Sequence, residues 1–244
     1  MRLLLIVAVV LLAGCADTPR PSAPDLAGLR ARLGLADVFT ASLLVQITPA
    51  TGDGEQFSLR LWRNSDGAVR VRAQKLDVDF LEALLRADGG YEALLPRERV
   101  ATAGALASPD APLLLRDLQL LLSDLRDGPL PRTVVPTGEA GRLTWTETNW
   151  NYELDLAVDG LPSAKRLSAD GVVQRDITYA RWQAYEGLMR PSQVRLRVAG
   201  DDGVMAIRLK SFDTPPTISA ERMALRLPDG VERVTPAEFS RRLP

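Results

Sequence analysis

The sequence predicts an α+β fold in which a few helices close a strongly curved antiparallel β-sheet. Two observations predict this architecture. In the first, apolar and polar residues alternate in many short segments separated by turn residues such as "SDG" at 65–67, a pattern typical of half-buried antiparallel strands. In the second, the leucines of the segment at 110–128 recur at helical spacing. When one face of a sheet is exposed to solvent, its apolar face must be buried, and a helix can cover that face.

The chain begins with a segment that has the order of a secretory signal. Arg2 supplies a positive charge, residues 3–12 are all apolar, and the small residues Ala13 and Gly14 precede Cys15. The apolar run is shorter than the roughly 20 residues that a transmembrane helix needs. Cys15 is the only cysteine of the chain, so it has no partner for an internal disulfide.

The stretch "LAGC" at the end of this run resembles the lipobox of bacterial lipoproteins. The resemblance implies cleavage before Cys15 and acylation of that residue, and two or more chains give stable membrane attachment. Asp17 lies one place beyond the position that favours inner-membrane retention in enterobacteria, which points to the outer membrane. An ordinary signal peptide with an incidental cysteine is the alternative. We expect a signal peptide at 1–14, a lipidated Cys15 and Pro-rich tether at 15–24, and a single domain at 25–244.

The first predicted elements of this domain are a short helix and a meander of strands. The helix is expected at 25–37, with Asp25 as its N-cap. The segment at 79–86 contains helix-forming residues, but its place in the meander favours a strand. The clearest strand segments are "FTASLLVQI" (39–47), "FSLRLW" (57–62), "AVRVRA" (68–73), "YEALL" (91–95) and "ERVATA" (98–103).

The segment at 110–128 is predicted to be a helix that Asp110 caps, with Pro112 in its first turn and Gly128 at its end. Its leucines exceed what one narrow face needs, so the helix must be covered on more than one side or line a cavity. Three hairpins and a final strand are expected after it. Their turns lie near 148–149, at 169–171 and at 200–203, and the final strand spans 222–232.

Composition argues against several classes of function. The 30 basic and 31 acidic residues give a net charge of −1, which gives no reason to expect nucleic acid binding. The chain has no histidine, which removes the commonest general base and metal ligand. With Cys15 assigned to lipid, thiolate zinc ligands are absent too. We therefore expect no metal, no cofactor and no enzymatic activity, and we interpret the carboxylate pairs Asp77/Asp79 and Asp201/Asp202 as structural or solvated residues.

Two long stretches are similar to the LolA/LolB lipoprotein-localisation superfamily. The first is "ASLLVQI…FSLRLWRNSDGAVRVRAQ…YEALLPRERVATAG" within 41–104. The second is "YARWQAYEGLMRPSQVRLRVAGDDGVMAIRLKSF…MALRLPDGV" within 179–231. The lipid anchor makes the chain resemble membrane-bound LolB more than soluble LolA. The resemblance implies an incomplete β-barrel that helices close and that holds acyl chains in an apolar hollow.

The resulting hypothesis is a lipid-anchored envelope protein that binds acyl chains of lipids or lipoproteins, in lipoprotein sorting or insertion. An apolar hollow suffices, because each CH₂ group moved out of water contributes about 0.8 kcal/mol. A periplasmic carrier protein is a further candidate partner. Two alternatives remain: a filled core without a hollow, and a non-catalytic structural or protein-interaction lipoprotein. The candidate lining residues are Phe57, Leu59, Leu61, Val69, Val71, Leu118, Leu122, Leu125, Trp150 and Tyr152.

Overall fold

The computed structural model describes residues 25–131, 136–138, 141–147, 149–200 and 203–243. Cys15, the predicted signal peptide and tether, and the pair Asp201/Asp202 lie outside the described residues. Among the helices within the described ranges, none is both long enough and apolar enough to span a bilayer.

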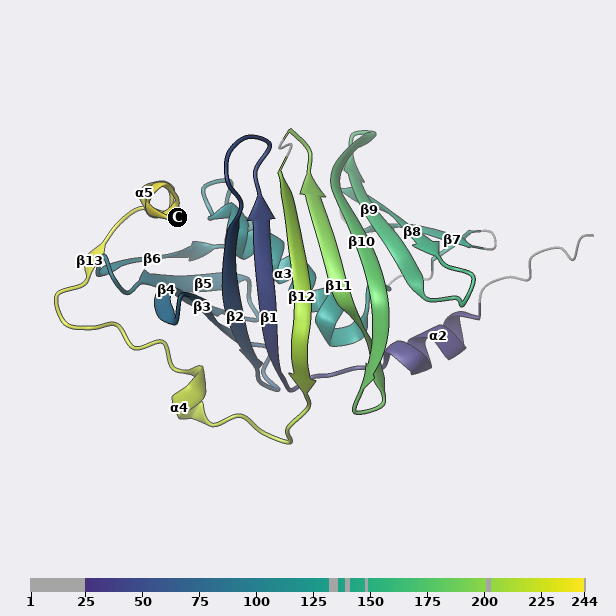
Figure 1. Cartoon of the computed structure of the whole chain (residues 1–244), viewed down its shortest axis with the longest axis horizontal. Helices are drawn as coiled ribbons and strands as arrows, with labels where there is room; N and C mark the ends of the chain where they lie inside the picture. The colour runs from purple at the N-terminus through teal and green to yellow at the C-terminus, as the bar shows by residue number, and fades with distance from the viewer. Residues whose placement is uncertain (1–24, 132–135, 139–140, 148, 201–202, 244) are drawn as a thin grey trace, which may run out of the picture.

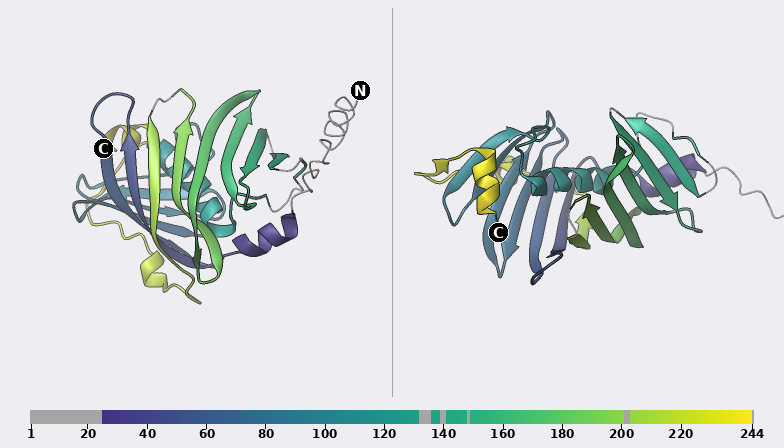
Figure 2. Two further views of the ribbon diagram at one scale, coloured as in Figure 1. Left: turned by 45° about the vertical axis from the view of Figure 1, so that its right-hand side comes forward. Right: turned by 90° about the horizontal axis from the view of Figure 1, so that it is seen from above.

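The described residues build one large, open, curved sheet (Figures 1 and 2). Its order is β13-β6-β5-β4-β3-β2-β1-β12-β11-β10-β9-β8-β7. Neighbouring strands are antiparallel, except that β13 pairs with β6 in parallel, so the sheet is mixed. The strands are β1 (Phe39–Thr48), β2 (Glu55–Arg63), β3 (Val69–Lys75), β4 (Val78–Leu85), β5 (Gly90–Leu95), β6 (Val100–Ala105), β7 (Arg142–Glu147), β8 (Trp150–Leu156), β9 (Pro162–Ala169), β10 (Val172–Tyr185), β11 (Leu188–Val198), β12 (Val204–Asp213) and β13 (Glu232–Arg233).

Within the described residues, four short helices accompany the sheet: α2 (Leu26–Leu33), α3 (Leu113–Asp127), α4 (Ala220–Met223) and α5 (Pro236–Arg242). Helix α3 crosses the concave side of the sheet, as the view from above shows (Figure 2, right). We call the sheet face that α3 covers the inner face, and the opposite face the outer face. Register irregularities, such as the one between Ser42 and Leu43 in β1, add local bend and twist to the strands.

The predicted strands are confirmed in most of the chain. The ambiguous segment at 79–86 is a strand, β4, and the hairpin turn predicted at 169–171 joins β9 to β10. Alternate residues point to opposite faces of a strand. In β2, Phe57, Leu59 and Leu61 are therefore buried on the inner face, while Arg60 is exposed on the outer face.

The strand predicted at 222–232 is wrong. Its first residues belong to α4, which Ser219 caps, and only Glu232–Arg233 form a strand. Met223, Leu225 and Leu227 do have the spacing of a strand. However, both sides of the preceding strand β12 are already paired, with β1 and β11, so the chain must travel to the free edge at β6.

The predicted helix ends need small corrections. Asp25 does cap α2, accepting a hydrogen bond from the Gly28 backbone at 2.9 Å, but the helix ends at Leu33 rather than at residue 37. Asp110 does not cap α3. The N-cap position is held by Pro112, which supplies no side-chain acceptor.

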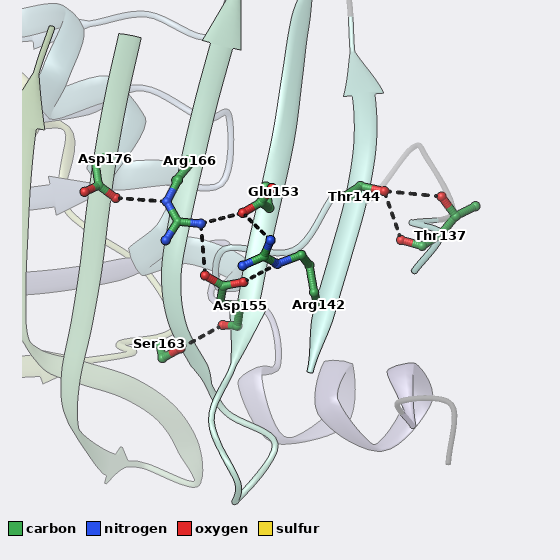
Figure 3. Close-up of polar contacts among 8 residues, drawn as sticks. All are labelled: Thr137, Arg142, Thr144, Glu153, Asp155, Ser163, Arg166 and Asp176. Carbon is green, nitrogen blue, oxygen red and sulfur yellow. Dashed lines mark hydrogen bonds and ion pairs between the residues drawn. The ribbon is translucent and has the colours of Figure 1, made fainter. Parts of the chain in front are cut away.

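On the outer face, an ion-pair ladder links the strands of the β7–β10 end of the sheet (Figure 3). Arg142 on β7 lies 3.2 Å from Glu153 and 2.7 Å from Asp155 on β8. Arg166 on β9 pairs with the same two carboxylates and reaches Asp176 on β10 at 3.8 Å. Opposite charges on neighbouring strands favour one register. That register turns Trp145, Tyr152 and Lys165 toward the inner face.

Candidate functional site

Helix α3 is the element that brings the candidate site together. Its apolar stripe packs into the hydrophobic core on the inner face of the sheet, because helical spacing of three and four residues places these side chains on one side. Leu113 near its start is 55% exposed, so the leucines do not all face the core. The buried leucines of α3 are Leu115, Leu118, Leu121, Leu122 and Leu125.

Two carboxylates on α3 fasten one edge of the helix to the sheet. Asp117 and Asp124 are both buried, and their spacing of seven residues places them two turns apart on the same side. The Asp124 carboxylate accepts hydrogen bonds from Lys165 Nζ of β9 at 2.7 Å and from the Tyr179 hydroxyl of β10 at 2.5 Å. Asp117 accepts from Arg175 Nε of β10 at 3.1 Å.

The environment of Tyr179 keeps its hydroxyl protonated. Burial raises the pKa of the Tyr179 phenol well above its usual value, and the adjacent Asp124 charge raises it further. The hydroxyl is therefore a hydrogen-bond donor to the carboxylate at neutral pH. Lys165 Nζ also lies 5.9 Å from the centre of the Tyr152 ring, within the range of a cation–π contact. The polar edge of α3 thus continues into an aromatic surface.

Arg190 on β11 holds the ends of α2 and α3. Its side chain is completely buried, and it donates hydrogen bonds to the backbone carbonyls of Leu33, Leu125 and Arg126. These carbonyls lie in the last turns of their helices, where no intrahelical donor is available. The guanidinium also lies 5.2 Å from the centre of the Phe212 ring. Burial lowers the pKa of Arg190 to about 10.

A pocket of about 250 Å³ opens beside the second half of α3. The Trp145 and Tyr152 rings stack in parallel on one of its sides, with ring centres 5.0 Å apart. A second pocket of about 530 Å³ shares these two residues. The smaller pocket combines apolar walls with the Asp124–Lys165 pair, and it is lined by Leu120, Ser123, Asp124, Asp127, Gly128, Leu130, Pro131, Trp145, Glu147, Tyr152 and Lys165.

The structure places the predicted lining residues in two groups. Eight of them are buried in one continuous core: Phe57, Leu59, Leu61, Val69, Val71, Leu118, Leu122 and Leu125. Trp150 and Tyr152 are partly buried at the edge of that core, and Tyr152 lines both pockets beside the aromatic stack. The inner face under α3 is therefore occupied by side chains, and the open space lies along the edge of the helix. A role of these ten residues in acyl binding stays a prediction.

The carboxylate pair at Asp77 and Asp79 has a structural explanation for one member. Asp79 on β4 accepts hydrogen bonds from Arg72 Nε at 2.7 Å and from Gln74 at 2.8 Å. The Arg72 guanidinium lowers the pKa of this carboxyl, and Gln74 lowers it further. Within the described residues, no group of three or more acidic, histidine or cysteine side chains is placed to hold a metal ion.

The polar residues that position α3 were not predicted from the sequence. Asp117, Asp124, Lys165, Tyr179 and Arg190 were not among the predicted site residues. One signal was available: Asp117 and Asp124 interrupt the leucine stripe at a spacing of seven, which marks a polar edge on an otherwise buried helix. Nothing in the local sequence pairs them with Lys165, Tyr179 or Arg175, since these partners lie 41 to 58 residues away.

Together these features define a class of protein: a curved sheet whose concave face is covered by one leucine-rich helix, with a partly apolar pocket at the helix edge. Solved structures with a similar overall fold exist. One is a LolA superfamily protein from Nitrosomonas europaea; the match covers 84% of this chain and 99% of that protein's chain, with a TM-score of 0.58 and 9% sequence identity. Another is a domain described as an outer membrane lipoprotein-sorting protein from Vibrio parahaemolyticus; the match covers 81% of this chain and 93% of that chain, with a TM-score of 0.57 and 10% sequence identity.

A DUF1329 family protein from Desulfovibrio piger is similar to the same extent. The match covers 82% of this chain and 95% of that protein's chain, with a TM-score of 0.57 and 12% sequence identity. No protein-family model matches the sequence, and no curated protein matches it. The chain has the LolA/LolB-like fold, as the two stretches within 41–104 and 179–231 predicted.

Proposed function

We propose that this protein is a lipid-anchored protein of the bacterial envelope that binds acyl chains of lipids or lipoproteins beside α3. The observation that carries the proposal is the pocket at the edge of this helix. Its walls combine Leu120, Leu130 and the Trp145–Tyr152 stack, which are apolar surfaces suited to a hydrocarbon chain. The similarity of the fold to a lipoprotein-sorting domain supports the same function.

The way α3 is held suggests how a longer chain would enter. The helix is fixed to β9 and β10 by Asp124 and Asp117, and at its end by Arg190. On its other side, leucines of α3 contact apolar side chains of the core, and such hydrophobic contacts are non-directional. In our proposal, the apolar side of α3 moves away from the sheet while the polar edge stays fixed. An acyl chain then replaces leucine contacts with equivalent apolar contacts.

The anchor and the location are part of the same proposal. Lipidation of Cys15 would hold the pocket close to a membrane, where acyl chains are available at high local concentration. The preferred membrane is the outer one, and the face toward the periplasm is where a carrier protein could deliver a lipoprotein. The folds of the lipoprotein-sorting and LolA superfamily neighbours support an envelope or periplasmic setting.

A matched pair of substitutions on α3 tests the binding site. The mature chain carrying Cys15→Ser is titrated with a fluorescent fatty-acid probe. Leu120→Glu puts a carboxylate in the pocket, whereas Leu113→Glu puts the same charge at a position that is 55% exposed. We expect the wild type to bind and Leu120→Glu to bind at least about tenfold more weakly, since a desolvated charge is costly beside an acyl chain. Leu113→Glu should bind like the wild type.

Thermal melts accompany the titrations, so that loss of binding is distinguished from loss of structure. A folded wild type that binds no probe would contradict the proposal. It would favour the alternative, a non-catalytic structural or protein-interaction lipoprotein with the same fold. Equal binding by all three proteins would place the acyl chain somewhere other than this pocket.

A further inference from the structure

A separate pocket lies on the outer face of the sheet, opposite α3. Its volume is about 560 Å³. Its floor is formed by β1, β2, β3 and β12, and one wall is formed by residues of α4 and its end. The lining contains four arginines and two carboxylates. The residues are Thr40, Ala41, Ser42, Arg60, Leu61, Trp62, Arg70, Arg72, Ser211, Asp213, Glu221, Arg222 and Ala224.

The strand register arranges the floor in rows. Ser211, Ser42, Arg60 and Arg72 follow one another across β12, β1, β2 and β3. Arg60 and Arg72 are therefore direct cross-strand neighbours with the same charge, a destabilising arrangement unless an anion compensates it. The adjacent row is Asp213, Thr40, Trp62 and Arg70.

The charges of two floor arginines are already compensated. Arg70 pairs with Glu82, and Arg72 pairs with Asp79 and lies 3.8 Å from Glu82. Arg60 is different: within the described part of the chain it has neither an ion pair nor a side-chain hydrogen bond. A guanidinium that faces another guanidinium without a carboxylate of its own leaves positive charge directed into the pocket.

Other hydrogen-bond donors that line the pocket also lack acceptors among the described residues. The hydroxyls of Ser42 and Ser211, the indole N–H of Trp62 and the guanidinium of Arg222 have no hydrogen-bond partner among the described residues. Of the two lining acids, Glu221 is paired with Arg226 at 3.2 Å, and Asp213 has no ion-pair partner among the described residues. The unpaired guanidiniums of Arg60 and Arg222 therefore outnumber the one unpaired carboxylate, and the pocket keeps a surplus of donors and positive charge.

We propose that this outer-face pocket binds a phosphate group, held by Arg60 from the sheet and Arg222 from the α4 wall. A phosphate offers several acceptor oxygens to guanidinium and hydroxyl donors. Its negative charge also compensates the electrostatic repulsion between Arg60 and Arg72. The group can belong to a soluble phosphate ester or to a phospholipid headgroup. The site lies on the face opposite the acyl pocket and does not depend on acyl binding.

Calorimetric titration tests the site, with the mature Cys15→Ser chain and two soluble probes, inorganic phosphate and glycerol 3-phosphate. Cosedimentation with phosphatidylcholine vesicles, with and without phosphatidylglycerol, tests the membrane source. Arg60→Gln and Arg222→Gln remove one donor group from each wall. Arg195→Gln is the control, since Arg195 is an exposed arginine of β11 on the same face but outside this pocket.

We expect phosphate binding that weakens with added salt. Arg60→Gln and Arg222→Gln should each weaken it about tenfold or more, because hydrogen bonds between charged groups are lost, and Arg195→Gln should not. Binding of the soluble probes identifies a soluble ester as ligand, and Arg60-dependent binding only to vesicles with phosphatidylglycerol identifies a headgroup. The proposal is overturned if no probe binds, if both pocket variants bind like the wild type, or if Arg195→Gln weakens binding equally.

Discussion

The Lys165 ammonium donates a hydrogen bond to the Asp124 carboxylate across 2.7 Å, and this pair joins β9 to α3 inside the protein. Both side chains are at most 7% exposed. A buried charge that loses its partner is strongly destabilising, whereas the intact pair need not add net stability. The pair therefore acts mainly by specifying which edge of α3 faces β9, and this choice directs the remaining leucines toward the core and the pocket.

Lys165→Met tests this role of the pair. The substitution leaves the buried Asp124 carboxylate with a single hydrogen-bond donor among the described residues, the Tyr179 hydroxyl, so we expect the free energy of unfolding to fall by about 3–5 kcal/mol. Lys210→Met is the control, because Lys210 is exposed on β12, and we expect it to change stability by no more than about 0.5 kcal/mol. Urea titrations followed by circular dichroism measure both. Equal effects of the two substitutions would show that the pair does not secure α3.

The tyrosines give the protein a specific sensitivity to alkali. The pKa values of all four, Tyr91, Tyr152, Tyr179 and Tyr185, are raised above 10.0, in each case first by burial. Above pH 10 the unfolded chain releases phenolic protons that the folded chain keeps, so the free energy of unfolding falls as the pH rises. Below that pH the folded state is not penalised by these groups.

Tyr179→Phe measures how much Tyr179, the tyrosine with the most strongly raised pKa, contributes to stability and to its pH dependence. At pH 7 the variant should be less stable by about 1.5–3 kcal/mol, because the hydrogen bond to the charged Asp124 is lost. Between pH 10 and pH 12 its stability should fall less steeply than that of the wild type. Urea midpoints measured across this range test the prediction, and parallel pH profiles for the two proteins would contradict it.

Arg190→Lys should be poorly tolerated although it conserves the charge. A lysine ammonium cannot reproduce the planar set of donors that serves the carbonyls of Leu33, Leu125 and Arg126. Each buried acceptor left without a partner costs about 1–3 kcal/mol, so we expect a loss of at least about 2 kcal/mol in thermal or urea unfolding. Arg195→Lys, at an exposed position, is the control. A near-wild-type Arg190→Lys protein would show that the helix ends do not depend on this side chain.

Cys15→Ser tests the predicted anchor. We expect the full-length variant to lose lipid modification and to remain unprocessed at the lipobox or to leave the membrane fraction. Membrane fractionation and the mass of the mature amino terminus measure these two properties. A variant that is processed and fractionates like the wild type would contradict lipidation of Cys15.

The sequence was sufficient to predict the strands because their signal is local. In β2, the alternation of Phe57, Leu59 and Leu61 with polar residues sets the strand and its inward face without reference to any partner. The leucines of α3 likewise identify a buried helix from their own spacing. Helix α5 was not predicted, although its sequence carries a local signal: Thr235 caps the helix, Pro236 begins it and Glu238 follows in its first turn.

The site was harder to predict, because it depends on partners that are distant in the chain. The contacts of Asp124 with Lys165 and of Arg190 with Leu33 join residues separated by 41 and 157 positions. No periodicity encodes such pairs. The path after β12 was mispredicted for a similar reason, since the pattern of Met223, Leu225 and Leu227 cannot show that both sides of β12 are occupied.

Photo-crosslinking is the most direct test of acyl-chain binding beside α3. The mature Cys15→Ser protein is irradiated with a diazirine-bearing fatty acid, digested, and mapped by mass spectrometry. We expect the label to be concentrated on peptides that contain Leu120, Leu130, Trp145 or Tyr152, and unlabelled fatty acid to compete with it. Labelling that avoids these peptides, or that no competitor reduces, would contradict acyl binding in this pocket.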